Sequence, residues 1–379
     1  MKFVIAPDSF KGSLTAKEVA IAIKAGISTV FPDADYELVP MADGGEGTVQ
    51  ALVAATNGQL VQVSVHNPLN QLCTATYGLL GDGKTAVIEM AQASGIQYVD
   101  EQTHNPLVTT TYGTGELILD ALNHGISQII LGLGGSATND GGAGMAQALG
   151  AHLLDANNQE VKPGGGNLDK LDHISTANLD PQLANTKFLI ASDVTNPLTG
   201  KEGASAVFGP QKGATPAMIK KLDHNLHHYA AIIQRDLNQA VEFQPGAGAA
   251  GGLGAGIMAF TNHEMAHGID LVIKYTHLKE RAQNADFVFT GEGGIDFQTK
   301  FGKTPYGVAK ATKQVAPNAP VIALSGNIGK GIDALYDTID AVFATPTGAK
   351  PLAKAITDSP HDIAETAENV ARLIKSLQK

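Results

Sequence analysis

Two glycine-rich loops carry many of the side chains in this sequence that could do chemistry. The first, GLGGSATNDGGA, spans residues 132–143, and the second, TGEGGIDFQTKFGKT, spans residues 290–304; each follows a short apolar run. Backbone N–H groups at the start of a helix attract phosphate, whereas the carboxylates of these loops would repel it unless a cation intervenes. Glycines and carboxylates together at strand ends therefore favour a nucleotide held through Mg²⁺.

A third polar loop, APDSFKGSL at residues 6–14, follows the first apolar run of the chain. Within four residues Asp8, Ser9 and Lys11 offer a base or metal ligand, a hydroxyl donor and a cation. Ligands of open α/β sheets bind at the carboxyl ends of strands, and this loop stands at such an end. The alternative is an ordinary strand-to-helix turn with a solvated lysine.

Two further strand ends present carboxylates. In MADGGEGT, residues 41–48, Asp43 precedes the pair Gly44 and Gly45, which would let a ligand approach the backbone. Asp193 follows an apolar run and precedes an Asn-Pro turn. The alternatives are acids that only complement a helix dipole and an ordinary Asx turn.

Residues 132–137 also match the dinucleotide pattern G-x-G-x-x-A, with Asp155 downstream as a possible ribose ligand. Asp140 counts against that interpretation, because a bare pyrophosphate would face its carboxylate. No Walker A motif is present, since the GKT at residues 302–304 lacks the earlier glycine. An NAD-dependent dehydrogenase of a small hydroxy acid remains the alternative enzyme class.

The composition of the chain limits the classes of molecule that it is expected to bind. The chain has 379 residues, a formal net charge of −11, 43% hydrophobic residues and a single cysteine. A nucleic-acid partner is disfavoured because no basic stripe could neutralise phosphates, and one cysteine excludes an internal disulfide. No apolar stretch approaches the roughly 20 residues of a membrane span. We expect a cytoplasmic protein, a monomer or a homodimer, with small-molecule substrates.

The order of elements predicts an α/β fold. Apolar runs alternate with amphipathic stretches, which is typical of parallel sheets; Thr15 and Glu18, for example, predict a capping box at the start of a helix. We expect a discontinuous Rossmann-like parallel-sheet domain at residues 1–65 and 285–379. A second α/β domain, residues 66–284, is inserted into it, with the active site in the cleft between the two.

Six motifs together resemble those of the type-1 glycerate kinases, in the same order and over nearly the whole chain. They are APDSFKGSL, MADGGEGT, GGSATNDGGAGMAQALGA, SDVTNPLTG with GASAVFGPQKGAT, GAGAAGGLGAG and TGEGGIDFQTKFGKTPYGVA. The resemblance implies ATP-dependent phosphorylation of D-glycerate with Mg²⁺, more often to 2-phosphoglycerate than to 3-phosphoglycerate. Gly294 departs from it, because many members carry arginine there; Lys300 or Lys303 would then have to substitute.

The residues and the resemblance together give a set of expected roles. The expected catalytic residues are Asp193 as the base, then Asp8, with Lys11 neutralising charge. The expected substrate-binding residues are Ser9, Lys212, Lys300 and Lys303. The expected nucleotide-binding residues are Gly134, Gly135, Ser136, Thr138, Asn139, Gly44 and Gly45. The expected Mg²⁺ ligands are Glu292 and Asp296, with Asp43 and Asp140 as alternatives. We expect the triphosphate to sit where the 132–143 loop enters its helix.

Overall fold

The computed structural model describes residues 1–378, which form two compact units. The discontinuous unit comprises Met1–Gly58 and the chain from His267 onward, and the inserted unit is Gln59–Ala266. Both bounds differ from those expected at 65 and 285. Residues 59–65 join the inserted unit because they pair as a strand with Leu72–Leu79. Residues 267–284 join the discontinuous unit because their helices pack on the helix Thr304–Val315.

The discontinuous unit is built on a five-stranded, wholly parallel sheet in the order β13-β12-β11-β1-β2. Its strands are β1 (Lys2–Ile5), β2 (Asp35–Leu38), β11 (Phe287–Ile295), β12 (Val321–Ile328) and β13 (Ala341–Ala344). Its helices are α1 (Ala16–Ser28), α2 (Thr48–Thr56), α9 (Gly268–Tyr275), α10 (Leu278–Arg281), η5 (Phe297–Lys300), α11 (Thr304–Val315), η6 (Ile332–Leu335) and α12 (Leu352–Leu377). The strand order reverses between β1 and β11, which makes that boundary the topological switch point of a doubly wound sheet.

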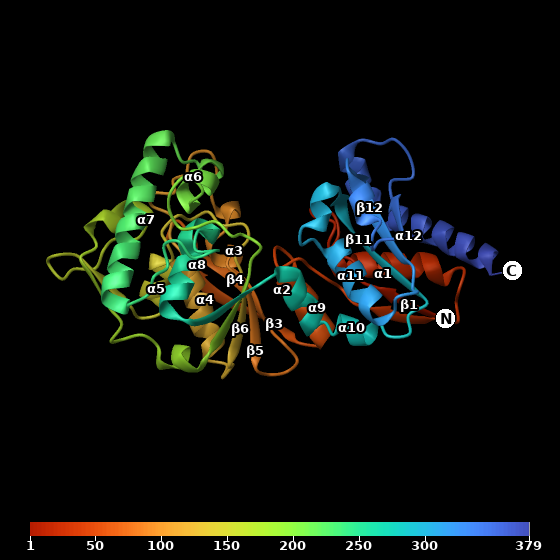
Figure 1. The fold of residues 1–379 in the computed structure, drawn as a ribbon, viewed down its shortest axis with the longest axis horizontal. Helices are drawn as coiled ribbons and strands as arrows, with labels where there is room; N and C mark the ends of the chain where they lie inside the picture. The colour runs from red at the N-terminus through yellow and green to blue at the C-terminus, as the bar shows by residue number, and fades with distance from the viewer. Residues whose placement is uncertain (379) are drawn as a thin grey trace. The chain divides into compact units, whose positions relative to one another are not determined.

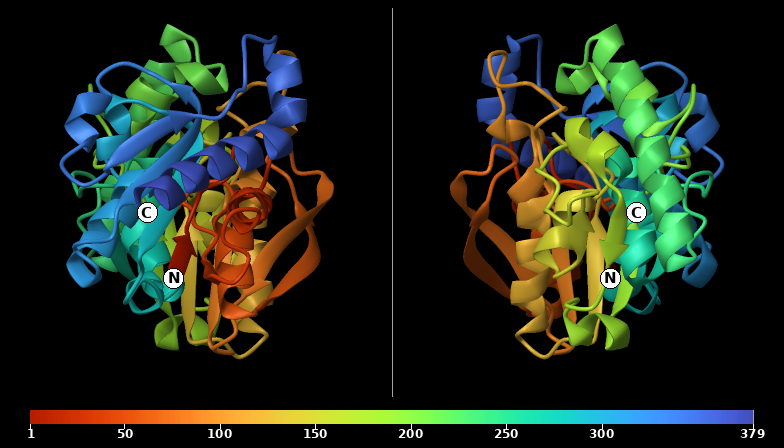
Figure 2. Two further views of the ribbon diagram at one scale, coloured as in Figure 1. Left: turned by 90° about the vertical axis from the view of Figure 1, so that its right-hand side faces the viewer. Right: turned by 90° about the vertical axis from the view of Figure 1, so that its left-hand side faces the viewer.

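Helix α1 shows how local sequence and packing agree. The predicted capping box is confirmed, because Thr15 Oγ1 accepts from the backbone N–H of Glu18 and Glu18 Oε2 accepts from that of Thr15. Val19, Ile23 and Ile27 are fully buried, as helical spacing predicts. They share a core with α12 and one face of the sheet. Helix α12 is the long blue helix in the left view of Figure 2.

The inserted unit contains a six-stranded mixed sheet in the order β10-β9-β6-β5-β4-β3. Its strands are β3 (Gln59–His66), β4 (Leu72–Leu79), β5 (Thr85–Glu89), β6 (Gln128–Gly132), β7 (His152–Leu154), β8 (His173–Ser175), β9 (Lys187–Ala191) and β10 (Asn262–Ala266); β7 and β8 form a separate hairpin. Its helices are α3 (Ala91–Ser94), η1 (Ile96–Tyr98), α4 (Tyr112–Leu122), α5 (Ala143–Ala148), η2 (Gly165–Lys170), η3 (Pro181–Asn185), α6 (Ala204–Phe208), η4 (Pro210–Lys212), α7 (Pro216–Leu237) and α8 (Ala249–Phe260). Figure 1 labels most of these elements. The α/β class predicted from the sequence is confirmed.

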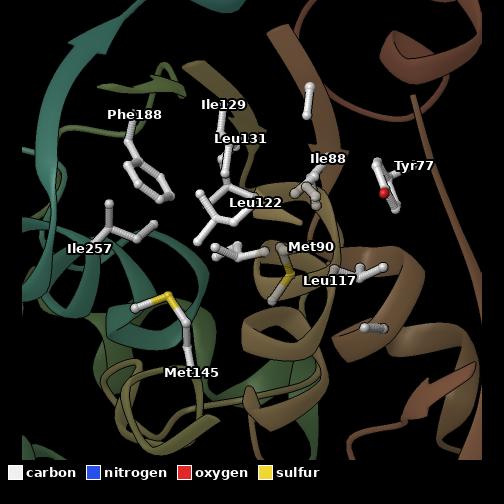
Figure 3. Packing of buried hydrophobic residues seen from close by; sticks show 14 of the residues in the cluster. Tyr77, Ile88, Met90, Leu117, Leu122, Ile129, Leu131, Met145, Phe188 and Ile257 are labelled. Atoms are coloured by element: carbon white, nitrogen blue, oxygen red, sulfur yellow. The ribbon is translucent and has the colours of Figure 1, made fainter. Parts of the chain in front are cut away.

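One core of the inserted unit fixes the loops that follow its strands. Side chains from one face of β5, β6 and β9 pack against those of α4, α5 and α8 (Figure 3). Ile88, Ile129, Leu131 and Phe188 are at most 1% exposed. Because these strands are anchored by burial, the loop that leaves β6 starts from a rigid base. Within residues 1–378, no helix has the length and apolar character of a membrane span.

The close approach of α1 and α12 should not tolerate a side chain at Gly26. A Cβ there would overlap the carbonyl oxygen of Ala364 and lie 2.9 Å from the backbone N of Glu368. Gly26→Ala should therefore lower the free energy of unfolding by about 1–3 kcal/mol, despite the better helix propensity of alanine. Urea titration measures this. Gly348→Ala, where a Cβ meets nothing within 4 Å, is the control, and equal stability of the two variants would contradict the packing argument.

Candidate functional site

Residues after β1 and β11 meet at the switch point of the discontinuous unit. The backbone N–H of Asp8 donates to the carbonyl of Gly291 at 2.8 Å, which ties the loop after β1 to β11. Glu292 follows Gly291 in β11 and is half-buried. The sheet topology thus places the expected base Asp8 and the expected metal ligand Glu292 at one edge, where doubly wound sheets bind ligands.

Asp8 is a buried carboxylate held by three donors. Its exposed fraction is 3%. Thr304 Oγ1 donates to Oδ2 at 2.6 Å, and Oδ1 accepts from the backbone N–H and the hydroxyl of Ser9 at 2.6 and 3.1 Å. Burial raises the pKa of Asp8 to about 6; the Thr304 bond opposes this rise, and the negative charge of Asp43 adds to it. A carboxylate of this pKa can accept a proton near neutral pH.

Glu292 is a second carboxylate with a raised pKa. Thr299 Oγ1 donates to its Oε1 at 3.2 Å, and the Nζ of Lys303 lies 3.6 Å from the same oxygen. Burial raises the pKa of Glu292 to about 7, Lys303 opposes the rise, and the charges of Asp8 and Asp43 add to it. The three carboxylates therefore repel one another electrostatically, with Lys303 compensating in part.

The loop 41–48 supplies the third carboxylate. Asp43 is half-buried, and its Oδ1 accepts from the backbone N–H of Gly45 at 3.0 Å. Gly44 has a φ of +94°, a conformation that favours glycine. The backbone of this loop also lies against Gly268, where a Cβ would overlap the carbonyl oxygen of Asp43. The glycines thus shape the turn that presents Asp43.

Two other expected residues of this unit have local partners. Asp296 caps η5 by accepting from the backbone N–H of Gln298 at 2.8 Å. The Nζ of Lys300 donates to Asp337 at 2.8 Å and to the carbonyl of Ala334 at 3.0 Å, toward η6. Of the two lysines expected in this loop, Lys303 is therefore the one beside Glu292.

Lys11 and Gly294 face open space. Lys11 is exposed, so its ammonium can reach a ligand. A Cβ at Gly294 would meet nothing within 4 Å. Steric contacts therefore do not require glycine at position 294.

The loop after β6 in the inserted unit offers free backbone donors. Gly134 and Gly135 are exposed and Ser136 is half-buried. Within residues 1–378, no protein acceptor takes the backbone N–H of any of these three residues. Gly135 has a φ of +74°, and successive amides around such a residue form concavities that bind anions. This part of the loop therefore stays the candidate phosphate-binding segment.

The start of α5, in contrast, is closed to a ligand. Asp140 is fully buried and accepts from the backbone N–H groups of Thr111, Gly142 and Gly144 at 2.8, 3.1 and 3.2 Å. Burial raises its pKa, and these bonds oppose the rise. The next amide, that of Met145, donates to Thr111 Oγ1. Asp140 and the amides at the start of α5 thus have partners within the protein, and the triphosphate position expected there stays a prediction.

Three other expected ligand-binding residues lie behind this loop. Thr138 and Asn139 are fully buried, and Asn139 Nδ2 donates to Ser205 Oγ at 2.9 Å. Lys212 is 2% exposed, and its Nζ donates to Ser136 Oγ at 2.7 Å and to the carbonyl of Thr138 at 2.6 Å. These side chains shape the loop from inside.

The glycine stretch of residues 246–256 packs against the same loop. Ala250, Gly251 and Gly252 interrupt α8 with positive φ angles. A Cβ on Gly251 would overlap the carbonyl oxygen of Thr138, and one on Gly252 would lie 2.8 Å from the Cα of Gly141. The glycines at positions 251 and 252 therefore serve close packing of the two backbones.

Asp193 lies on the same sheet edge as the 134–136 loop. It follows β9, which pairs with β6 so that Ala191 stands beside Gly132. Asp193 is exposed, unlike Asp8. Asp8, by comparison, is 3% exposed. The two candidate bases therefore differ in burial, and the order expected from the sequence, Asp193 before Asp8, stays a prediction.

The donor set around Glu292 fits a divalent cation completed by a ligand. Within residues 1–378, no three Asp, Glu, His or Cys side chains are placed to hold a metal ion together. Mg²⁺ is commonly held by one or two carboxylates plus substrate phosphates and water. Asp43 and Glu292 are two such carboxylates, and a cation would relieve the repulsion that raises the pKa of Glu292.

Sequence reasoning missed the hydroxyls that hold the carboxylates. Thr304 orients Asp8 from 296 residues away, and no local pattern signals that pairing. Thr111 binds both oxygens of Asp140. The run Thr109–Thr111 before α4 is a visible signal, but sequence alone does not show what it contacts.

Comparisons with known proteins extend over both units. A model of the Glycerate kinase family matches residues 3–375. A Halalkalibacterium halodurans protein named glycerate kinase is 52% identical over 97% of this chain and 97% of its own length. An Escherichia coli K12 protein named glycerate 2-kinase is 50% identical over 98% and 97%. The crystal structure of a Salmonella typhimurium LT2 protein assigned as glycerate kinase 2 aligns with a TM-score of 0.91 and 50% identity, covering 100% of this chain and 99% of that one.

Asp8→Asn should stabilise the protein at pH 8 but not at pH 4. Folding raises the pKa of Asp8 from 3.8 to about 6, so above pH 6 the folded state bears the cost of a buried charge. That cost is about 3 kcal/mol. It disappears as the pH falls toward 4, where the folded protein holds the proton. Urea titration at both pH values, with the exposed Asp33→Asn as control, measures the difference; destabilisation by Asp8→Asn at pH 8 would contradict the raised pKa.

Proposed function

The chain belongs to the glycerate kinase family, and on this premise we propose that it transfers the γ-phosphoryl group of ATP to the 2-hydroxyl of D-glycerate, with Mg²⁺. The relatives' names support glycerate as the acceptor, and the Escherichia coli protein named glycerate 2-kinase supports the 2-hydroxyl. The structural observation that carries the proposal is Asp8, a buried carboxylate whose pKa of about 6 suits a base at a ligand-binding sheet edge.

Asp8 would receive the proton of the acceptor hydroxyl. As that oxygen forms its bond to the γ-phosphorus, the bond from phosphorus to the β–γ bridging oxygen breaks, and ADP leaves. Thr304 and Ser9 hold the carboxylate in one orientation, so its position is set before substrate binds. Phosphoryl transfer needs little more from a protein than such positioning and charge stabilisation.

Each unit, taken by itself, offers candidate groups for the remaining charges. Asp43 and Glu292 would hold Mg²⁺, which when bound neutralises charge on phosphoryl oxygens. The free N–H groups of Gly134–Ser136 suit the polyphosphate. Lys11, which is exposed, and Lys303, beside Glu292, suit the carboxylate of glycerate or the transferring group.

The dehydrogenase alternative has less support. Asp155, its expected ribose ligand, sits in a surface turn where its carboxylate accepts from the backbone N–H groups of Asn157 and Gln159. The loop that matched the dinucleotide pattern is shaped by Asp140 and Lys212 from inside. Neither feature favours NAD, and family membership favours the kinase.

The function is tested by an ADP-release assay with D-glycerate, ATP and Mg²⁺. We expect ADP release that depends on all three, and a product whose phosphorus NMR signal couples to the single proton on C2. Asp8→Asn purified in parallel controls for contaminating kinases. Hydroxypyruvate-dependent oxidation of NADH without ADP release would contradict the proposal and support the dehydrogenase.

Asp8→Asn should lower kcat by about 10²-fold or more, because the amide cannot accept the proton. Asp193→Asn is the matched variant and should have a smaller effect. In the wild type, kcat/KM should rise with pH between 5 and 8, since Asp8 and Glu292, with pKa values of about 6 and about 7, must lose their protons. A larger loss in Asp193→Asn than in Asp8→Asn would assign the base to Asp193.

A further inference from the structure

Lys212 is a buried lysine whose hydrogen bonds all point to one loop. It ends η4, is 2% exposed, and donates from Nζ to Ser136 Oγ and to the carbonyl of Thr138. A lysine side chain is seldom buried, because removing its charge from water costs free energy. Its burial beneath this loop therefore calls for a physical reason.

An ion pair does not supply that reason. Within residues 1–378, no carboxylate lies within salt-bridge distance of the Lys212 ammonium. The nearest acid that influences it is Asp140, whose oxygens are taken by Thr111, Gly142 and Gly144. Burial lowers the pKa of Lys212 to about 7, and Asp140 opposes that fall. The free-energy cost of burying this amine is therefore offset mainly by its hydrogen bonds to Ser136 and Thr138.

The loop that Lys212 holds also contains backbone donors that have no protein acceptor within the described residues. Ser136 binds Lys212 through its hydroxyl, while the backbone N–H groups of Gly134, Gly135 and Ser136 have no protein acceptor within the described residues. Gly134 and Gly135 are exposed. The buried amine and the free amides thus belong to the same short segment, and free backbone amides favour a bound negative charge.

We propose that Lys212 is a positioning residue that fixes the 134–138 loop in the shape that receives the polyphosphate of the nucleotide, without touching any substrate itself. The inference rests on the proposed function, in which this loop binds that polyphosphate. The carbonyl of Thr138 and the hydroxyl of Ser136 are the two attachment points. Its burial argues against the substrate contact expected from the sequence.

The test separates nucleotide binding from glycerate binding. Lys212→Met keeps the length of the side chain but removes its donors, which leaves the Thr138 carbonyl without its partner. We expect the Kd of Mg-ADP, measured by calorimetry, to rise about 10-fold or more. The KM for D-glycerate should stay within about twofold of the wild-type value. Lys187→Met, at the far end of β9 from the loop, is the matched control and should change neither.

A double-mutant cycle tests whether Lys212 affects nucleotide binding through its hydrogen bond to Ser136. If Lys212 acts by holding Ser136, Ser136→Ala should weaken Mg-ADP binding clearly in the wild type and far less in Lys212→Met. Lys212→Gln, which retains donors, should recover part of the lost affinity. It also keeps the test available if Lys212→Met does not fold, since unchanged nucleotide affinity in Lys212→Gln and in Ser136→Ala would overturn the proposal.

Three results would count against the inference. Equal losses for nucleotide and glycerate would show a general structural role. Additive effects in the cycle would show that Lys212 and Ser136 act independently. Unchanged Mg-ADP affinity in Lys212→Met would show that the loop needs no support from Lys212. Failure of the proposed function is a separate outcome, because the wild type would then show no glycerate-dependent ADP release.

Discussion

The burial of one carboxylate, Asp8, is the constraint on which the discontinuous unit depends. A buried charge is costly unless hydrogen bonds compensate it. Here Thr304 and Ser9 supply three bonds, yet the pKa still rises to about 6. The unit therefore accepts lower stability above that pH, and it holds a carboxylate in one orientation at the switch point of its sheet, where we propose that it accepts a proton. Glu292 and Asp43 are repelled by each other's negative charge and by that of Asp8. A bound cation would reduce this repulsion.

In the inserted unit, buried side chains hold a loop rather than a carboxylate. Within the described residues, the loop after β6 has backbone N–H groups without a protein acceptor, and such donors are unfavourable when buried. The loop therefore exposes Gly134 and Gly135 and is held from behind by Lys212, by Asp140 and by the glycines of α8. Buried ionisable groups in both units thus fix backbone segments near exposed polar groups. Tightly packed glycines allow the backbones to approach closely enough.

Much of the architecture could be predicted from the sequence. Alternating apolar runs and the capping box at Thr15 gave the α/β class and a helix start, because both signals are local. The bounds of the two compact units depend on contacts that a local pattern does not show. The pairing of residues 59–65 with the next strand, and the packing of residues 267–284 on a helix near the C-terminus, are long-range contacts without a local signature.

The candidate site, like the fold, has some features that the sequence predicts and others that depend on long-range contacts. Glycine and carboxylate spacing pointed to the loops, but it could not show that Asp8 is buried and Asp193 exposed. Nor could it show that Asp296 caps η5, that Lys300 pairs with Asp337, or that Lys212 points inward. Each of these depends on partners brought together only by folding. Composition and motif order identify the family, whereas the assignment of roles requires the three-dimensional arrangement.

The protonation of Asp8 is the most direct test of this account. Carbon-detected NMR of protein labelled at the aspartate side-chain carboxyl carbon, with the Asp8 signal assigned by its loss in Asp8→Asn, would follow that single group with pH. We expect the Asp8 carboxyl to titrate with a midpoint at pH about 6. A midpoint near the ordinary value of 3.8 would show a solvated carboxylate and would contradict the role of Asp8 as the proton acceptor.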